Sequence, residues 1–267
     1  MSDTQDHKSV VREEFTKQAS AYAANSSVNS SERVDRLIRA ISPSAGARVL
    51  EVATGPGYVA LGFATVCREV VGVDLTEALL TIAERTRQER GLNNIRFLEG
   101  DAENLPFEDR DFDVVLCRFA FHHFADPSRV LGEMVRVCRP QGTVAVEDLI
   151  VSEHPSRGEH QNRFEQLRDP SHKRAYPLGK LIELFAAMGL EVEHIYTDAL
   201  TQEVGRWLSN AQTPSSKAAE AQAMIERDAV EDLSGARPFW RDGNLYFIQR
   251  TGTVTGHRLA KAASNAV

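Results

Sequence analysis

The sequence has no long apolar stretch and no surplus of basic residues. No run of about 18 apolar residues occurs in its 267 positions, so a membrane-spanning segment is not expected. The balance of 31 Lys and Arg against 38 Asp and Glu gives a net charge of −7. Nucleic-acid-binding proteins usually carry a basic patch or stripe. We therefore expect neither a membrane nor a nucleic acid as partner.

Cysteine is also scarce. Cys67, Cys117 and Cys138 are widely spaced in apolar surroundings, and their odd number fits neither a disulfide framework nor a zinc site. His154 and His160 have no acid at ligand spacing, so no metal is expected. The first residues lack the basic start and apolar stretch of a signal peptide. Together these features favour a reducing, cytoplasmic location.

The apolar residues that are present divide the chain into a helical part and a mixed part. Residues 1–45 show helical spacing, interrupted by a hinge or helix cap at 25–31. Between 47 and 150, short apolar strands alternate with helices, which predicts a mainly parallel sheet with right-handed crossovers. We expect strands at 48–52, 69–74, 95–99, 112–117 and 143–149, and helices at 58–67, 76–90 and 127–138.

The remainder of the chain carries weaker patterns. Residues 151–177 are polar and show no clear periodicity, whereas residues 201–233 have the spacing of an amphipathic helix. We assign 46–250 to one α/β domain, treat these two segments as substrate-side insertions, and expect 251–267 to be a flexible tail. A helix at 178–188, a strand at 191–196 and a last strand at 244–250, after an Asp242-Gly243 turn, complete the expected elements.

The strongest signal for a ligand is a glycine-rich turn between an expected strand and an expected helix. Because Gly55 and Gly57 have no side chains, a ligand can approach their backbone, and the next helix turns its free N–H groups toward that ligand. In open α/β sheets, ligands bind at the carboxyl ends of the strands, where this turn is expected. A tight structural turn without a ligand would explain the same glycines.

Two acids follow the next two strands. Asp74 ends the strand at 69–74, where a carboxylate can accept hydrogen bonds from both ribose hydroxyls. Asp101 follows the strand at 95–99 and can accept from the exocyclic amine of adenine, while the N–H of Ala102 can donate to a ring nitrogen. The pattern predicts a pocket for an adenosine compound but leaves its identity open, because Gly55-x-Gly57-x-x-Ala60 also satisfies the dinucleotide fingerprint.

These motifs resemble those of the class I S-adenosylmethionine-dependent methyltransferases, most closely the small-molecule branch that includes the ubiquinone- and menaquinone-biosynthesis enzymes. Glu51-x-Ala53-x-Gly55-x-Gly57 is similar to the family's first motif, although the family more often has Asp at the position of Glu51 and Gly at the position of Ala53. Asp74 matches its ribose-binding acid, residues 100–107 resemble its adenine-side motif, and residues 112–124, with their His-His pair, resemble its fourth motif.

The resemblance implies a Rossmann-like α/β fold with a mainly parallel seven-stranded sheet, helices on both faces and a helical lid at 1–45. It implies S-adenosyl-L-methionine as cofactor and a small-molecule acceptor. Phe15-x-x-Gln18-Ala19-x-x-Tyr22 resembles the lid helix, with Tyr22 closing over the methionine end. The cofactor contacts predicted in this way are Tyr22, Glu51, Ala53, Gly55, Gly57, Asp74, Leu75, Asp101, Ala102 and Arg118.

Methyl transfer is an in-line displacement that requires a general base only if the acceptor must lose a proton. His122 and His123 follow the strand at 112–117, and we predict His123 as the pocket residue of the two. His172 is a second candidate base. Asn162, Arg168 and His172 follow the last parallel strand, where the family places acceptor-binding elements, and are predicted to bind substrate. Each histidine could instead serve packing or capping.

Several alternatives remain at this point. Arg118 can pair with Asp148 or with an anionic substrate. A nicotinamide-dependent oxidoreductase would use the same glycine turn, and the fold could be repurposed for cofactor binding or cyclisation without methyl transfer. Residues 117–120 lack the motif of base-modifying methyltransferases. The acceptor, the target atom (oxygen, nitrogen or carbon) and the choice between monomer and homodimer stay open.

Overall fold

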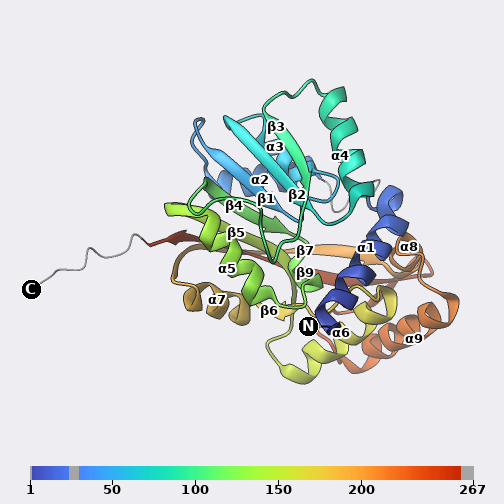
Figure 1. Cartoon of the computed structure of the whole chain (residues 1–267). Coiled ribbons are helices and arrows are strands. Elements are labelled where there is room, and N and C mark those ends of the chain that lie inside the picture. The colour runs from blue at the N-terminus through green and yellow to red at the C-terminus, as the bar shows by residue number, and fades with distance from the viewer. Residues whose placement is uncertain (1, 24–29, 260–267) are drawn as a thin grey trace, which may run out of the picture.

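A computed structural model describes residues 2–23 and 30–259, apart from the side chains of residues 2–4 and 22. Figure 1 shows one twisted sheet with helices on both faces. The strand order is β3-β2-β1-β4-β5-β9-β7. The strands are β1 (Arg48–Val52), β2 (Glu69–Asp74), β3 (Ile95–Glu99), β4 (Phe112–Arg118), β5 (Cys138–Val151), β7 (Leu190–Glu203) and β9 (Asn244–Arg258), with short β6 (Tyr176–Pro177) beside β5 and β8 (Phe239–Arg241) beside β9.

The central strands are parallel, as predicted, because their residues are apolar on both faces. Val49, Leu50, Val70 and Val71 are completely buried, which is the burial expected of a sheet covered on both sides. The chain runs from β1 outward to β2 and β3 and then returns to place β4 on the other side of β1. This reversal creates a switch point between β1 and β4, where open α/β sheets bind their ligands.

Two helical layers cover the sheet. Helices α2 (Ser31–Ile41) and α3 (Tyr58–Phe63) pack on one face through residues such as Leu37 and Phe63. Helices α5 (Pro127–Val137) and α7 (Leu178–Ala187) pack on the other face through residues such as Met134 and Leu181. Helix α4 (Glu77–Glu89) lies beside β3 (Figure 1). These layers confirm the predicted Rossmann-like fold class.

The segment at 151–177 differs from the prediction, because it contains the helix α6 (Pro155–Arg168). Hydrophobic periodicity misses this helix because its buried face includes Gln161, Asn162 and Glu165, each no more than 3% exposed. The amphipathic segment at 201–233 divides into α8 (Val204–Asn210) and α9 (Ser215–Glu231).

These three helices form a separate apolar cluster around Phe164, Trp207 and Phe247. Helix α1 (Ser2–Ala23) runs past α4 and α8 and thereby connects this helical region to the sheet (Figure 1). None of the described helices combines the length and the apolar character that crossing a membrane requires.

The expectation of a flexible tail from Thr251 is wrong for the described residues. Residues 251–258 continue β9, which pairs antiparallel with both β5 and β7 and so lies inside the sheet. The stretch Thr-Gly-Thr-Val-Thr-Gly has the composition of a loop. However, Gly252 and Gly256 lie so close to neighbouring segments of the same chain that a side chain would not fit at either position. Thr253 and Thr255 are buried at 1% exposure. Pairing with β5 and β7, and not the local sequence, therefore gives these residues their strand conformation. The predicted tail residues 260–267 lie outside the described residues.

Val254 provides a direct test of the position of β9. It is completely buried between Val146 of β5 and Ile195 of β7. Val254→Ala should lower the free energy of unfolding by roughly 2 kcal/mol, because it leaves a cavity in the core. Chemical denaturation measures this change, and Glu191→Ala, at an exposed position of β7, is the matched control. An unchanged free energy of unfolding for Val254→Ala would place residues 251–258 outside the core.

Candidate active site

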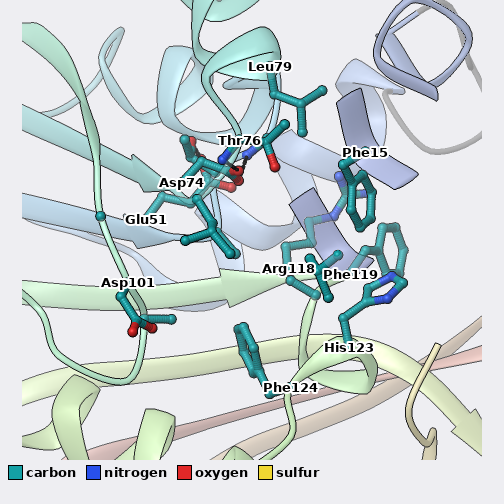
Figure 2. A pocket seen from close by; sticks show the side chains of 18 of the residues that line it. Phe15, Glu51, Asp74, Thr76, Leu79, Asp101, Arg118, Phe119, His123 and Phe124 are labelled. Carbon is teal, nitrogen blue, oxygen red and sulfur yellow. Dashed lines mark hydrogen bonds between the residues drawn. The ribbon is translucent and has the colours of Figure 1, made fainter. Parts of the chain in front are cut away.

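A large cavity lies at the carboxyl ends of β1, β2 and β4 and beneath α1 (Figure 2). It contains about 990 Å³ of empty space, including its open mouth, and small-molecule sites are usually of roughly this size or smaller. The structure brings eight of the ten predicted cofactor contacts to its wall. They are Glu51, Ala53, Gly55, Asp74, Leu75, Asp101, Ala102 and Arg118. The side chain of Tyr22 lies outside the described residues.

Asp74 connects the end of β2 to the glycine turn. Its Oδ2 accepts a hydrogen bond from the N–H of Gly55 at 2.8 Å, and its Oδ1 accepts from the N–H of Thr76 at 2.8 Å. Burial raises the pKa of this carboxyl, while the backbone donors act in the opposite direction. Asp74 therefore shapes the turn as well as lining the cavity.

Gly57 has a different role from the one predicted. It does not line the cavity but precedes α3 with a φ of +78°. A Cβ at this position would approach the Phe97 ring to 2.7 Å. The left-handed backbone and the contact with Phe97 are by themselves sufficient to require glycine at this position. Ala53, which does line the cavity, also has a positive φ, of 54°.

Glu51 is the acid of the first motif, and its carboxyl group is buried beneath the turn. Its Oε2 accepts hydrogen bonds from the Thr54 hydroxyl at 2.5 Å and from the N–H of Ala60 at 2.8 Å. Burial raises the pKa of Glu51 to about 7, although these donors and Arg118 lower it. Its Oε1 has no hydrogen-bond partner in the described part of the chain and is available to a cation in the cavity.

Asp101 is engaged by α1 in a contact that sequence reasoning missed. The Nζ of Lys8 lies 2.8 Å from Asp101 Oδ2 and 2.8 Å from Glu103 Oε2. His7 also donates from Nε2 to the carbonyl of His123 at 2.8 Å. The sequence held a signal for this surface, because His7, Val11 and Phe15 recur every four residues and therefore share one helical face.

Arg118 lies at the end of β4 and forms a buried ion pair with Glu147 at 3.0 Å. Its guanidinium group also lies over the Phe119 ring, 4.4 Å from the centroid. The predicted partner Asp148 is wrong, because the carboxylate of Asp148 binds His122 instead. Alternating side chains of β5 place Glu147 and Asp148 on opposite faces of the sheet, so Arg118 reaches only the first.

A second cavity adjoins the first. The two share Phe15, Phe119 and His123, which Figure 2 shows grouped at one side of the first cavity. Phe119 has a φ of +52°, a conformation that is unusual for a bulky residue and that is found preferentially at functional sites. The second cavity is also lined by Gln18, His122, Leu149, Arg168, Asp169, Leu200, Gln202, Trp207, Asn210 and Gln249.

Sequence reasoning identified only part of this second wall. Leu200 and Gln202 come from β7 and Gln249 from β9, which are distant in the chain from the recognised motifs. No local pattern marks these positions. Long-range strand pairing brings them together, so the sheet order had to be known first.

The two adjacent histidines have different partners. His122 Nδ1 lies 2.5 Å from Asp148 Oδ1, and burial opposes its charged form, but Asp148 outweighs burial and raises the pKa. His123 Nδ1 donates to the Ser171 carbonyl at 3.0 Å. Burial, together with the neighbouring His122, lowers the pKa of His123 to about 4. His123 is therefore neutral at physiological pH.

His172 and Asn162 do not line either cavity, contrary to their predicted contact with substrate. His172 Nε2 lies 2.8 Å from Asn162 Oδ1, and burial holds its pKa well below the usual range. Asn162 also bonds both backbone groups of Ala175, so it fixes the loop after α6. Arg168 does line the second cavity, and its Nε donates to the Trp207 carbonyl at 3.0 Å. Among the described residues, no group of three or more His, Cys, Asp and Glu side chains is placed to hold a metal ion.

Comparison with known proteins places the chain in a family. The Methyltransferase domain family matches residues 50–146. The uncharacterized methyltransferase YcgJ of Bacillus subtilis is 34% identical over 238 residues, which are 89% of this chain and 91% of YcgJ. The demethylmenaquinone methyltransferase of Thermus thermophilus is 46% identical over 101 residues, 37% of this chain and 46% of that enzyme.

Solved structures agree with this assignment. The crystal structure of YcgJ has a TM-score of 0.81 at 28% identity and covers 86% of this chain and 99% of its own. A putative methyltransferase, BH2331, from Bacillus halodurans has a TM-score of 0.81 at 27% identity and covers 86% and 100%. Fold and cavity thus define a Rossmann-like enzyme that uses S-adenosyl-L-methionine.

The chain belongs to the class I S-adenosylmethionine-dependent methyltransferases. The family resemblance seen in the sequence motifs is confirmed, and the nicotinamide-dependent oxidoreductase is set aside. The donor fits the residues that are present. The cavity offers acids for an ammonium group, a ribose and an adenine amine at Glu51, Asp74 and Asp101, respectively.

Glu51 provides a prediction about pH. Its pKa of about 7 means that protonation near neutral pH removes a negative charge that, in the expected binding mode, would face the ammonium group of the ligand. We expect the Kd of S-adenosylhomocysteine, measured by calorimetry, to be about tenfold weaker at pH 6 than at pH 8, because binding must release one proton at the lower pH. Glu51→Gln should weaken binding and abolish this slope. Glu99→Gln, at an exposed position, is the control. Identical slopes in wild type and Glu51→Gln would show that Glu51 does not bind the ligand.

Proposed function

We propose that this enzyme transfers the methyl group of S-adenosyl-L-methionine to a small-molecule acceptor that occupies the second cavity. The observation that carries the proposal is the wall shared by the two cavities, formed by Phe15, Phe119 and His123. In-line displacement requires donor and acceptor to meet at one point with their reacting atoms aligned. Two adjacent cavities that have three lining residues in common would place a donor and an acceptor next to each other.

The proposed orientation of the donor follows from the acids of the first cavity. Asp101 would accept from the adenine amine, Asp74 from the ribose hydroxyls, and Glu51 from the ammonium group. The sulfonium then lies between the ribose and the methionine end, on the side where Arg118 and Phe119 close the cavity. The methyl group would therefore face the shared wall.

The lining of the second cavity supports a small and partly polar acceptor. Apolar surface comes from Leu149, Leu200 and Trp207, and hydrogen-bonding groups come from the glutamines of α1, β7 and β9. Helix α1 lies over the cavity through Phe15 and Gln18, which favours a small molecule over a polymer. The similarity to the demethylmenaquinone methyltransferase covers only 37% of this chain. The acceptor of that enzyme is therefore not assigned to this chain.

A fold of this kind without methyl transfer is the rival proposal. The [4+2]-cyclase SpnF shares the fold at a TM-score of 0.64 and 18% identity. This similarity concerns the fold alone. The rival predicts that the donor binds and is not consumed.

Substitution of Asp74 tests the donor site. Asp74→Ala should raise the Kd of S-adenosylhomocysteine by about 100-fold, because two hydrogen bonds to a charged group are lost. Asp109→Ala, whose side chain is 71% exposed, should leave the Kd unchanged. Calorimetry measures both values. An unchanged Kd for Asp74→Ala would refute the assignment of the cavity to the donor.

Transfer itself is tested with donor that carries a radiolabelled methyl group. We expect label in small aromatic and hydroxylated acceptors and none in protein or tRNA. Trp207→Ala should raise the acceptor KM and leave the Kd of S-adenosylhomocysteine unchanged, because Trp207 lines only the second cavity. Label in protein or tRNA alone would contradict the small-molecule acceptor, and absence of all transfer would favour the rival.

A further inference from the structure

His122 and Asp148 form a buried pair that donor binding does not use. Asp148 is 2% exposed, and its carboxylate accepts from His122 Nδ1 at 2.5 Å. The same carboxylate accepts from the backbone N–H of His122 at 2.9 Å and from that of Leu149 at 2.5 Å. Three donors fix the position of this carboxylate. The carboxylate in turn fixes the orientation of the imidazole.

This orientation leaves one nitrogen of the ring free for chemistry. With Nδ1–H donating to Asp148, neutral His122 carries its lone pair on Nε2. In the described part of the chain, Nε2 makes no hydrogen bond. The His122 side chain lines the second cavity and not the first, so the free nitrogen belongs to the acceptor side of the shared wall.

The other two histidines of the cluster are committed elsewhere. His123 lines both cavities and uses Nδ1 to bind the Ser171 carbonyl. His172 lines neither cavity and uses Nε2 to bind Asn162. Their rings lie 4.1 Å and 5.2 Å from the His122 ring, respectively. His123 does line the cavities, as expected of a pocket residue, but the carboxylate partner belongs to its neighbour His122.

The charged groups facing His122 come from three elements. Asp148 lies on β5, Glu165 lies on α6, and Asp169 and Arg168 lie at the end of α6. The three carboxylates favour a positive charge on His122, whereas burial and the positive charge of Arg168 oppose it, and the neutral rings of His123 and His172 add no charge. The carboxylates prevail in this setting. His122 can consequently accept and hold a proton inside the protein.

We propose that His122 is the general base of the reaction, that Asp148 is its positioning residue, and that the acceptor is a neutral hydroxyl compound of the phenol or enol class. This inference rests on the proposed function. The O–H bond breaks and its proton moves to His122 Nε2. The oxygen forms a bond to the methyl carbon as the S–CH₃ bond breaks and its electron pair stays on sulfur. The positive charge of the sulfonium thus ends on the imidazolium, beside Asp148.

The chemistry of the second cavity favours this acceptor class over others. A carboxylic acid arrives already ionised, needs no base and would be repelled by the carboxylates of Asp148, Glu165 and Asp169. An aliphatic amine arrives as an ammonium ion, which these carboxylates would hold in its protonated form, and it has no lone pair for attack until that proton leaves. A phenol or enol is neutral when it binds and becomes a good nucleophile only as its proton leaves, which is the step that a buried base assists.

The test uses a series of acceptors of graded acidity with radiolabelled donor. The probes are 4-methylphenol, 4-chlorophenol and 4-nitrophenol, the enol of a 1,3-diketone, and benzylamine, thiophenol and benzoate as other classes. We expect wild type to methylate the phenols and the enol. His122→Gln should lower kcat for 4-methylphenol by about 10²- to 10⁴-fold, and this loss should shrink toward 4-nitrophenol, which ionises without help. Asp148→Asn should also lower kcat, with the largest loss for 4-methylphenol and the smallest for 4-nitrophenol.

The pH profile provides a readout that a purely structural role would not change. Wild-type kcat for 4-methylphenol should fall as the pH drops through the raised pKa of His122, because the protonated ring cannot accept a proton. His122→Gln should lose this limb while keeping the Kd of S-adenosylhomocysteine within twofold. His194→Gln, at an exposed position of β7, is the matched control, and thermal melting verifies that each variant folds.

The outcomes separate this inference from the proposed function. An equal loss for all three phenols in His122→Gln, or no loss, would overturn the general base. Methylation of the amine, thiol or carboxylate in place of the hydroxyl compounds would overturn the acceptor class, and methyl transfer as such would stand. Donor binding without transfer to any acceptor class would overturn the proposed function itself. If both variants fail to fold, a wild-type kcat that does not change with pH would still refute the base.

Discussion

The site depends on the buried carboxylate of Asp74, which ties the glycine turn after β1 to the end of β2. Its hydrogen bonds to the N–H groups of Gly55 and Thr76 connect the loop after β1 to the start of α4. A carboxylate buried this deeply is stabilised only when donors surround it. The two backbone N–H groups provide such donors, and they also position the carboxylate for a ligand. The floor of the donor cavity thus lies at the carboxyl ends of the strands, and the loops that follow them and α1 complete its wall.

The acceptor side is constructed differently. Its walls come from α1, from the loop after β4, from α6 and α8, and from the long antiparallel strands β7 and β9. These elements meet only because β9 inserts between β5 and β7. The helical cluster around Phe164 and Trp207 then supports α6, whose buried polar residues hold the loop that follows this helix. The proposed donor site is therefore built mainly at the carboxyl ends of the parallel strands, and the proposed acceptor site is built from α1, the C-terminal strands and the helices packed on them.

This division explains what the sequence could reveal. The glycine turn, Asp74 and Asp101 each follow a strand directly, so local spacing was sufficient to place them at one edge of the sheet. The strand at 251–258 was not predictable in this way, because its threonines and glycines acquire their conformation from β5 and β7. Helix α6 was hidden because it buries glutamine, asparagine and glutamate. The choice between His122 and His123 depended on which ring meets Asp148, a matter of side-chain direction that adjacent positions in a sequence do not reveal.

Helix α1 has a consequence for the order of events in turnover. Phe15 lines both cavities, and its ring lies edge-on to His123, 4.9 Å between centroids. The same helix is fastened by Lys8 to Asp101 and by His7 to the His123 backbone. A displacement of α1 would therefore alter the walls of both cavities together. Release of the demethylated donor and entry of a fresh acceptor would then be linked through the N-terminal helix.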